Sequence, residues 1–223
     1  MIDLKELKKI LDFKKKEKNF RYCFYVENNN IFNYLKKYIY KKSEKFEVLL
    51  YSNEEIFFDQ NKNIFALNIK SKFLSYFFFK NLNIKYIYSS TPDINNSYFV
   101  KSKNKCKYIY IQHSPVSLIM AYNFRAFINF DAIQTVNTHQ YFETSLINKK
   151  FNLKLKPFKS KYSFLELASE KKIKKKNLLV APTWNTDFYK RNIHNELFYI
   201  LKNNSIKFDF RPHFMSLKKK EID

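Results

Sequence analysis

Glycine is absent from this 223-residue chain, and its absence excludes two common kinds of phosphate-binding loop. The G-x-G-x-x-G turn and the Walker-type loop both need glycine to bring backbone close to a phosphate. Any phosphate bound here must therefore be held by helix N-termini, by Arg, Lys or His, or by hydroxyl groups. Left-handed backbone positions fall to Asn and Asp instead, and we expect them at Asn28-Asn29-Asn30 and Asn203-Asn204.

Cysteines and long apolar runs are also scarce. Cys23 and Cys106 form no metal-type pair and are typical of structural thiols in a reduced, cytoplasmic protein. The longest apolar run, residues 73–79, is far shorter than the roughly 20 residues that span a bilayer. The N-terminal residues MIDLKELKKILDFKKK lack the apolar core of a secretory signal. The sequence shows no cluster of metal ligands, so we expect neither a metal nor a cofactor.

Positive charge, in contrast, is abundant: the formal net charge is +22. Such a charge normally indicates nucleic acid or an anionic membrane as a partner. Lys, Asn, Ile, Phe and Tyr all have A/T-rich codons, however, so biased base composition explains much of the excess. The lysines are spread along the chain and the aromatic residues fall in core-like strands. We therefore expect no nucleic acid and keep anionic substrates and membranes as partners.

Residues 1–18 read as a basic amphipathic helix, in which Leu4, Leu7 and Leu11 share one face. Two interpretations stay open: the helix packs against the domain, or it anchors the protein on a membrane surface.

An alternation of short apolar runs and helical patterns follows, which predicts an α/β fold with a mostly parallel sheet. Hydrophobic residues make up 45% of the chain, enough for a sizeable core. We divide the chain into the helix at 1–18, a Rossmann-like domain at 19–150, a basic connector at 151–176, and an incomplete second Rossmann-like domain at 177–223. The first domain is expected to contain strands at 20–26, 46–51, 64–69, 84–89, 108–111 and 131–136, and helices at 31–40, 70–82, 117–130 and 139–147. The second domain is expected to contain strands at 177–181 and 206–210 and a helix at 195–202.

Three predicted strands end in similar polar tips. The first is followed by Gln112-His113-Ser114-Pro115, the second by Pro182-Thr183-Trp184, and the third by Arg211-Pro212-His213. Polar residues at the carboxyl ends of parallel strands converge on the ligand crevice of such folds. A histidine with its ordinary pKa can deprotonate a hydroxyl at neutral pH, while arginine and a second histidine can neutralise a phosphate. A lone histidine at a strand end is more often structural or simply exposed, and Pro182-Thr183-Trp184 also fits a packed turn, so the ordered set is more specific than any single tip.

The ordered set resembles the CDP-glycerol:poly(glycerophosphate) glycerophosphotransferase family, the teichoic-acid polymerase and primase type. The resemblance rests on three motifs: IQHSPVS at 111–117, LLVAPTWN at 178–185 and FRPH at 210–213. It covers roughly residues 84–215. The chain departs from the family pattern at Ser114, Asn185 and Phe214, where the family commonly has Gly, Arg and Pro.

The resemblance implies a GT-B architecture and a transferase that moves a polyol phosphate from a CDP-activated donor to an acceptor hydroxyl. It implies His113 as the base, with Arg211, His213 and Thr183 binding the donor phosphates. Gln112, Ser114 and Trp184 would support them. The 19–150 domain would hold the acceptor and the 177–223 segment the nucleotide donor.

The implied setting is teichoic-acid-like cell-wall or capsule synthesis. The acceptor would be lipid-linked or polymeric, and the protein would be cytoplasmic and peripheral on the inner face of the membrane. Family members continue beyond the point where this chain stops, so we also expect a fragment, a truncated gene product or a split enzyme. An inactive remnant that binds a partner or membrane, and a nucleic-acid-binding module, are the alternatives.

Overall fold

The computed structural model describes residues 3–59, 63–95, 97–161, 177–182, 187–213 and 216–217. The chain divides into two compact units, 1–170 and 171–223.

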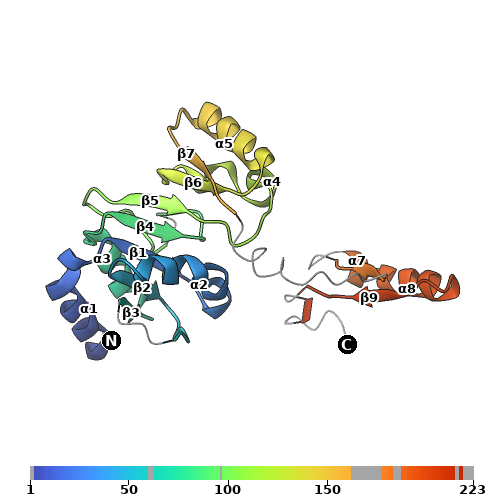
Figure 1. The fold of residues 1–223 in the computed structure, drawn as a ribbon, viewed down its shortest axis with the longest axis horizontal. Helices are drawn as coiled ribbons and strands as arrows, with labels where there is room; N and C mark the ends of the chain where they lie inside the picture. The colour runs from blue at the N-terminus through green and yellow to red at the C-terminus, as the bar shows by residue number, and fades with distance from the viewer. Residues whose placement is uncertain are drawn as a thin grey trace. The chain divides into compact units, whose positions relative to one another are not determined.

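The first unit is built on a seven-stranded sheet in which every neighbouring pair of strands is parallel (Figure 1). The strand order across the sheet is β3-β2-β1-β4-β5-β6-β7. The strands are β1 (Tyr22–Val26), β2 (Val48–Ser52), β3 (Ile64–Asn68), β4 (Tyr86–Ser89), β5 (Lys107–Tyr110), β6 (Ala132–Thr135) and β7 (Lys156–Lys159). Strands β1 and β2 are buried along their whole length, which explains their continuous apolar sequences.

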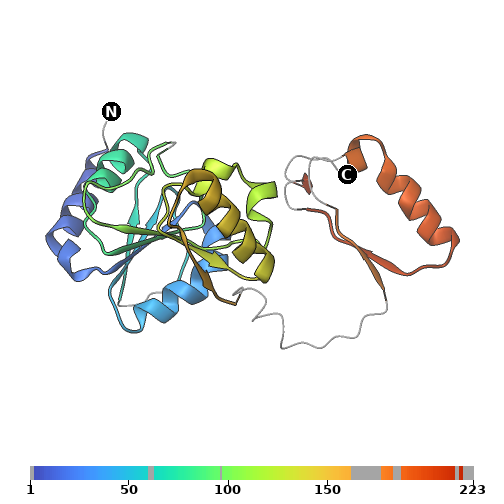
Figure 2. The ribbon, with the colours of Figure 1, turned by 90° about the horizontal axis from the view of Figure 1, so that it is seen from above.

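Helices cover the two faces of this sheet unequally. Figure 2 shows α1 and α3 on one side of the sheet and α2 on the other. The larger core cluster joins one sheet face to residues of α1, α3, η2 and α5, and the smaller cluster joins the other face to α2. The helical elements of this unit are α1 (Leu4–Lys16), η1 (Glu17–Asn19), α2 (Asn29–Ser43), α3 (Lys72–Lys80), α4 (Leu118–Ala121), η2 (Phe124–Phe127) and α5 (Thr138–Phe151).

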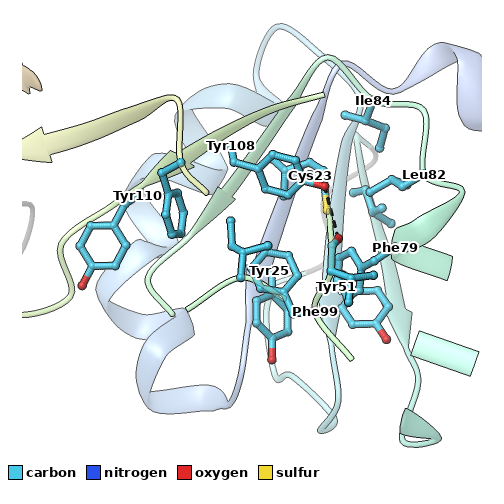
Figure 3. Packing of buried hydrophobic residues seen from close by; sticks show 14 of the residues in the cluster. Cys23, Tyr25, Tyr51, Phe79, Leu82, Ile84, Phe99, Tyr108 and Tyr110 are labelled. Carbon is cyan, nitrogen blue, oxygen red and sulfur yellow. Dashed lines mark hydrogen bonds between the residues drawn. The ribbon is translucent and has the colours of Figure 1, made fainter. Parts of the chain in front are cut away.

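Aromatic rings fill the larger core cluster (Figure 3). The Tyr25 and Phe99 ring centroids are 4.5 Å apart, and those of Tyr51 and Phe79 are 4.6 Å apart. Cys23 is completely buried in this cluster, and burial raises the pKa of its thiol. A thiol with a raised pKa is a poor nucleophile, in agreement with the structural role expected for it.

Strand β7 was not expected, because the sequence analysis places residues 151–176 in a connector. Lys156–Lys159 instead pair with β6 and form an edge of the sheet. Its sequence, KPFK, contains two lysines and a proline, which are the residues that protect edge strands from further pairing. Because these residues leave the strand with little apolar content, it could not be predicted from apolar runs in the sequence.

The helix expected at 117–130 is wrong in its length. A helix forms over Leu118–Ala121, and Tyr122 then adopts an extended backbone, with φ −130° and ψ 155°. The side chain of Asn123 accepts a hydrogen bond from the backbone N–H of Arg125 at 2.9 Å and starts the separate 3₁₀ helix η2. The hydrogen bond from the Arg125 N–H to the Asn123 side chain thus favours a new helix start at this point over one continuous helix.

Left-handed backbone falls mainly to Asn and Asp, as expected, but at other positions. Among the described residues, positive φ occurs at Asp93, Asn95, Asn152, Asn192 and Ser205. The expected sites were wrong: Asn28 is the extended N-cap of α2, and Asn204 has φ −92°. The side chain of Asn28 accepts a hydrogen bond from the N–H of Ile31 at 3.0 Å, a capping role that these short amides fill equally well.

The second unit contains a strand–helix–strand arrangement of the expected kind. Two parallel strands, β8 and β9, pair with one another. Among the described residues of this unit, the buried hydrophobic side chains are Tyr189 and Leu201. The elements are β8 (Leu178–Val180), α7 (Asp187–Lys190), α8 (Ile193–Asn203) and β9 (Phe208–Phe210).

Candidate active site

The strand order of the first unit reverses between β1 and β4. The chain moves outward from β1 through β2 to β3 and then returns to place β4 beside β1. Open parallel sheets bind ligands at the carboxyl ends of their strands near such a reversal. Glu27 follows β1, Ser90 follows β4, and Gln112-His113 follows β5, the neighbour of β4. The histidine identified from the sequence therefore lies at the carboxyl ends of the strands, where this fold class places its ligands.

His113 is half-buried, close to Tyr34 of α2 and to the residues that directly follow β1 and β4. Its ring centroid lies 6.4 Å from that of Tyr34 on α2. Burial lowers the pKa of the imidazole below its usual 6.5, while a hydrogen bond with the Ser90 backbone and the negative charge of Glu27 act in the opposite direction. Burial has the larger effect, so the neutral form of the ring is favoured over the imidazolium.

Glu27 is the residue that the sequence analysis missed. Its Oε1 accepts a hydrogen bond from Thr91 Oγ1 at 2.8 Å, which connects the tips of β1 and β4. The carboxylate is also near enough to His113 to raise its pKa. The signal was present in the sequence, because Glu27 is the first polar residue after the apolar strand YCFYV, as Gln112 and His113 are after theirs.

Buried side chains hold the segment on either side of His113. The backbone N–H of Gln112 donates to Gln134 Oε1 at 3.0 Å, and its Nε2 donates to the Gln134 carbonyl at 3.2 Å. Farther along, Gln140 Nε2 donates to the Val116 carbonyl at 2.7 Å. Gln112 is therefore a residue that fixes the strand tip to β6, while Ser114 is half-buried beside His113.

Glu143 of α5 completes this support. One of its oxygens accepts a hydrogen bond from the Ser117 hydroxyl, and the other accepts from the backbone N–H of Leu118 at 2.7 Å. The Glu143 side chain is only 1% exposed, so these bonds are shielded from water. The start of α4, just after the histidine loop, is thus fixed to α5.

Three aspartates lie at or near the ends of predicted strands, where a carboxylate could orient an imidazole: Asp93, Asp131 and Asp187. Asp131 precedes β6 and accepts the backbone N–H of Tyr108 at 2.8 Å, which places it at the opposite, amino end of the strands. Asp187 belongs to the second unit, where it pairs with Arg191 at 3.1 Å. Asp93 donates its backbone N–H to the Ala126 carbonyl at 2.9 Å. The carboxylate whose charge acts on His113 is that of Glu27.

In the second unit, Arg211 and His213 lie directly after β9, and both are exposed. The backbone N–H of Arg211 donates to the Val180 carbonyl at 2.9 Å, which continues the β8–β9 pairing and brings the two strand tips together. The His213 carbonyl accepts the N–H of Ser216 at 2.9 Å. Thr183 and Trp184 lie outside the described residues.

The arrangement in the first unit suits proton transfer. An imidazole with a lowered pKa, a nearby carboxylate and a threonine hydroxyl lie at the tips of neighbouring strands, and the first turn of α2 carries no acidic residue. Within the part of the chain that the structure describes, no group of three or more His, Cys, Asp or Glu residues could hold a metal ion. A general base that acts on a hydroxyl is chemistry that these residues can carry out.

Comparison with known proteins shows a likeness of fold. No protein-family model matches the chain, and no curated protein matches it. A structure of the wall teichoic acid polymerase TagF, a histidine-to-asparagine variant soaked with CDPG for 30 minutes, matches 100% of this chain and 67% of that chain. The identity is 13% and the TM-score 0.53. The same variant after a 15-minute soak matches 98% of this chain and 67% of that one, at 12% identity and TM-score 0.50. The predicted fold class, an α/β chain of the GT-B type, is confirmed.

Proposed function

We propose that this protein is a transferase that moves glycerol phosphate, or a related polyol phosphate, from a CDP-activated donor to an acceptor hydroxyl. The observation that carries the proposal is the half-buried His113, with its lowered pKa, at the strand tips beside Glu27. The fold likeness to a polymerase whose structure was determined with CDPG supports the choice of donor.

The chemistry follows from the properties of these groups. His113 accepts the proton of the acceptor hydroxyl as its oxygen attacks the phosphorus that carries the polyol. A new phosphorus–oxygen bond forms, the pyrophosphate linkage breaks, and its electron pair leaves with CMP. Glu27 stabilises the imidazolium that results, because a carboxylate favours the charged form of a neighbouring histidine.

The residues after β8 and β9 are proposed to bind the donor. Arg211 and His213 would neutralise the pyrophosphate, and Thr183 would add a hydroxyl contact. Arginine suits this role because its planar donors match phosphate oxygens in pairs. Gln112 supports the proposal through its bonds to Gln134, which fix the strand that carries His113. Supporting roles for Ser114 and Trp184 belong to the same proposal.

The proposed setting is the synthesis of a teichoic-acid-like or capsular polymer on the cytoplasmic face of the cell membrane. The acceptor would be lipid-linked or polymeric, and the CDP-polyol would serve as donor substrate without a further cofactor. The net charge of +22 is compatible with anionic partners of this kind, since both the polymer and the lipid headgroups are negatively charged.

The experiment measures CDP-glycerol binding by calorimetry and CMP release in the presence of a lipid-linked acceptor. We expect His113→Ala to reduce CMP release about a hundredfold or more while donor binding remains, because general-base catalysis contributes at least that factor. Arg211→Gln should weaken donor binding instead. Tyr141→Ala is the matched control, because the Tyr141 side chain is 54% exposed on α5.

Two results would contradict the proposal. One is the absence of calorimetric binding of any CDP-polyol, and the other is CMP release by His113→Ala at the rate of the unaltered protein. Lipid binding without donor binding would favour the inactive, membrane-binding remnant. Binding to generic duplex DNA with a steep salt dependence would favour the nucleic-acid-binding alternative.

A further inference from the structure

Helix α1 packs against the first unit through an unexpected side. The side chains of Glu6 and Phe13 are buried, and Leu7 and Ile10 pack partly against the core. Leu4 is 77% exposed and Leu11 is 54% exposed, although both belong to the apolar face that the sequence indicates. The helix is therefore attached to the domain and still presents leucines to the solvent.

The neighbouring helix α3 also exposes apolar side chains. Phe73 is 59% exposed, Phe77 is 48% exposed and Tyr76 is 39% exposed. Their rings contact one another: the Phe73 and Phe77 centroids are 4.7 Å apart, and those of Tyr76 and Phe77 are 5.5 Å apart. Leu74, Phe78 and Phe79 already fill the buried side of this helix, so core packing does not account for the outer rings.

The two helices lie side by side and run in the same direction. Near the start of both, Glu6 accepts the backbone N–H groups of Lys70 and Ser71, at 2.7 and 3.2 Å. Near the end of both, Lys14 Nζ donates to the Asn81 carbonyl at 2.7 Å. Figures 1 and 2 both show the pair on the same side of the sheet.

Helical spacing joins the exposed side chains of the two helices. Residues 4, 7, 11 and 14 recur at intervals of three and four along α1, and residues 73, 77 and 81 recur at intervals of four along α3, so each set forms one stripe. The hydrogen bond between Lys14 and Asn81 connects the ends of these stripes. The exposed leucines and the exposed rings therefore belong to one surface, which we call the α1–α3 surface.

Lysines surround this apolar patch. Lys8 and Lys15 lie one helical turn from Leu4 and Leu11 on α1, Lys72 lies one turn from Tyr76 on α3, and all three lysines are exposed. Of the two acidic residues of α1, Glu6 is buried on backbone N–H groups, and Asp12 offsets Lys15 by pairing with it at 3.1 Å. Helix α3 contains no acidic residue. The patch is thus apolar at its centre and positively charged at its margin.

We propose that the α1–α3 surface docks on an anionic lipid bilayer, with its rings and leucines in the interface and its lysines at the headgroups. Aromatic rings and lysine stems suit this position because each combines an apolar body with a polar end. A second copy of the chain is disfavoured as the occupant, because it would bring two lysine-rich margins together. Among the described residues, no helix is long and apolar enough to cross a membrane.

The test is co-sedimentation of the chain with phosphatidylcholine vesicles, with and without phosphatidylglycerol. We expect binding to the anionic vesicles. A Phe73→Ser, Phe77→Ser double variant should partition at least tenfold more weakly, because it lacks the apolar area that the two rings would bury in the bilayer. Replacing Lys8 and Lys72 with Gln should reduce binding about fivefold per lysine on anionic vesicles alone. Phe142→Ser is the matched control, because Phe142 on α5 is also 59% exposed.

Several results would overturn the proposal. They are the absence of vesicle binding by the unaltered chain, unchanged binding by the double variant, and an equal loss in the Phe142→Ser control. A dimer that dissociates in the double variant, without vesicle binding, would identify a second copy as the occupant. Circular dichroism verifies that each variant is folded. The inference does not depend on the transferase proposal, since calorimetric binding of CDP-glycerol tests that separately.

Discussion

The pKa of His113, at the carboxyl ends of the strands, is set by opposing effects. Burial lowers its pKa, while the Ser90 backbone and the Glu27 carboxylate raise it, and burial dominates. A proposed base with a lowered pKa is neutral over most of the physiological range. The Glu27 charge then matters most once the ring has accepted a proton, which is the moment at which a transferase needs it.

This balance predicts how the histidine titrates. The His113 imidazole should titrate below pH 6.5, and Glu27→Gln should lower its pKa further, because the variant lacks a charge that favours the imidazolium. NMR titration of the ring protons, assigned with His113→Ala, measures both values. Since the neutral ring is the active form, catalysis should be lost as the pH falls through this pKa, and Glu27→Gln should retain it to lower pH.

Glu44→Gln is the control for this titration, because Glu44 is an exposed residue at the end of α2. A His113 pKa above 6.5, or a rise in the Glu27→Gln variant, would contradict the environment described for the ring.

At the scale of elements, Glu143 connects α5 to the start of α4. Glu143→Gln can keep the Leu118 N–H on its amide oxygen, but its NH2 group cannot accept, so the Ser117 hydroxyl loses the acceptor for its proton. We expect the free energy of unfolding to fall by about 1–3 kcal/mol, the cost of leaving a buried polar group unsatisfied. Urea unfolding measures this change.

The same control serves here, since Glu44→Gln should change the free energy of unfolding by less than about 0.5 kcal/mol. Equal stability of Glu143→Gln and the unaltered protein would show that the α4–α5 connection carries no net stabilisation.

At the scale of the whole molecule, the two units differ greatly in their cores. The first unit buries aromatic and aliphatic side chains on both faces of a seven-stranded sheet. The described part of the second unit pairs two strands and buries Tyr189 and Leu201. Two strands and one main helix bury little apolar surface against the entropy of ordering the chain.

Residues 1–170 expressed alone should therefore unfold in one cooperative thermal transition, whereas residues 171–223 alone should show no transition. Circular dichroism at increasing temperature measures both. A cooperative transition in the shorter segment would mean that its core is more extensive than its described residues indicate.

Local patterns carried most of the fold prediction. The strands around Cys23, Leu50, Ile87 and Ile133 were predicted because buried parallel strands are apolar along their length. The patterns failed where polar side chains act locally or where an element has little apolar content. Asn123 divides the helix expected at 117–130, and Lys and Pro conceal β7.

The site was predicted in part for the same reason. His113 was found because it follows an apolar strand directly, and its place after β5 agrees with that reasoning. Glu27 was missed because it is 86 positions earlier in the sequence, and its approach to His113 depends on β4 lying between β1 and β5.

The sequence by itself determined the class of fold, the strands and the residues at their tips, because these depend on the spacing of apolar side chains and on turn-forming residues. The tertiary structure alone decided which tips are neighbours, how burial lowers the pKa of His113, and which side of α1 faces the solvent. Leu4 and Leu11 illustrate the difference. Periodicity groups them on one face, but which face is buried depends on the fit between Phe13, Glu6 and α3, and that fit exists only in the folded chain.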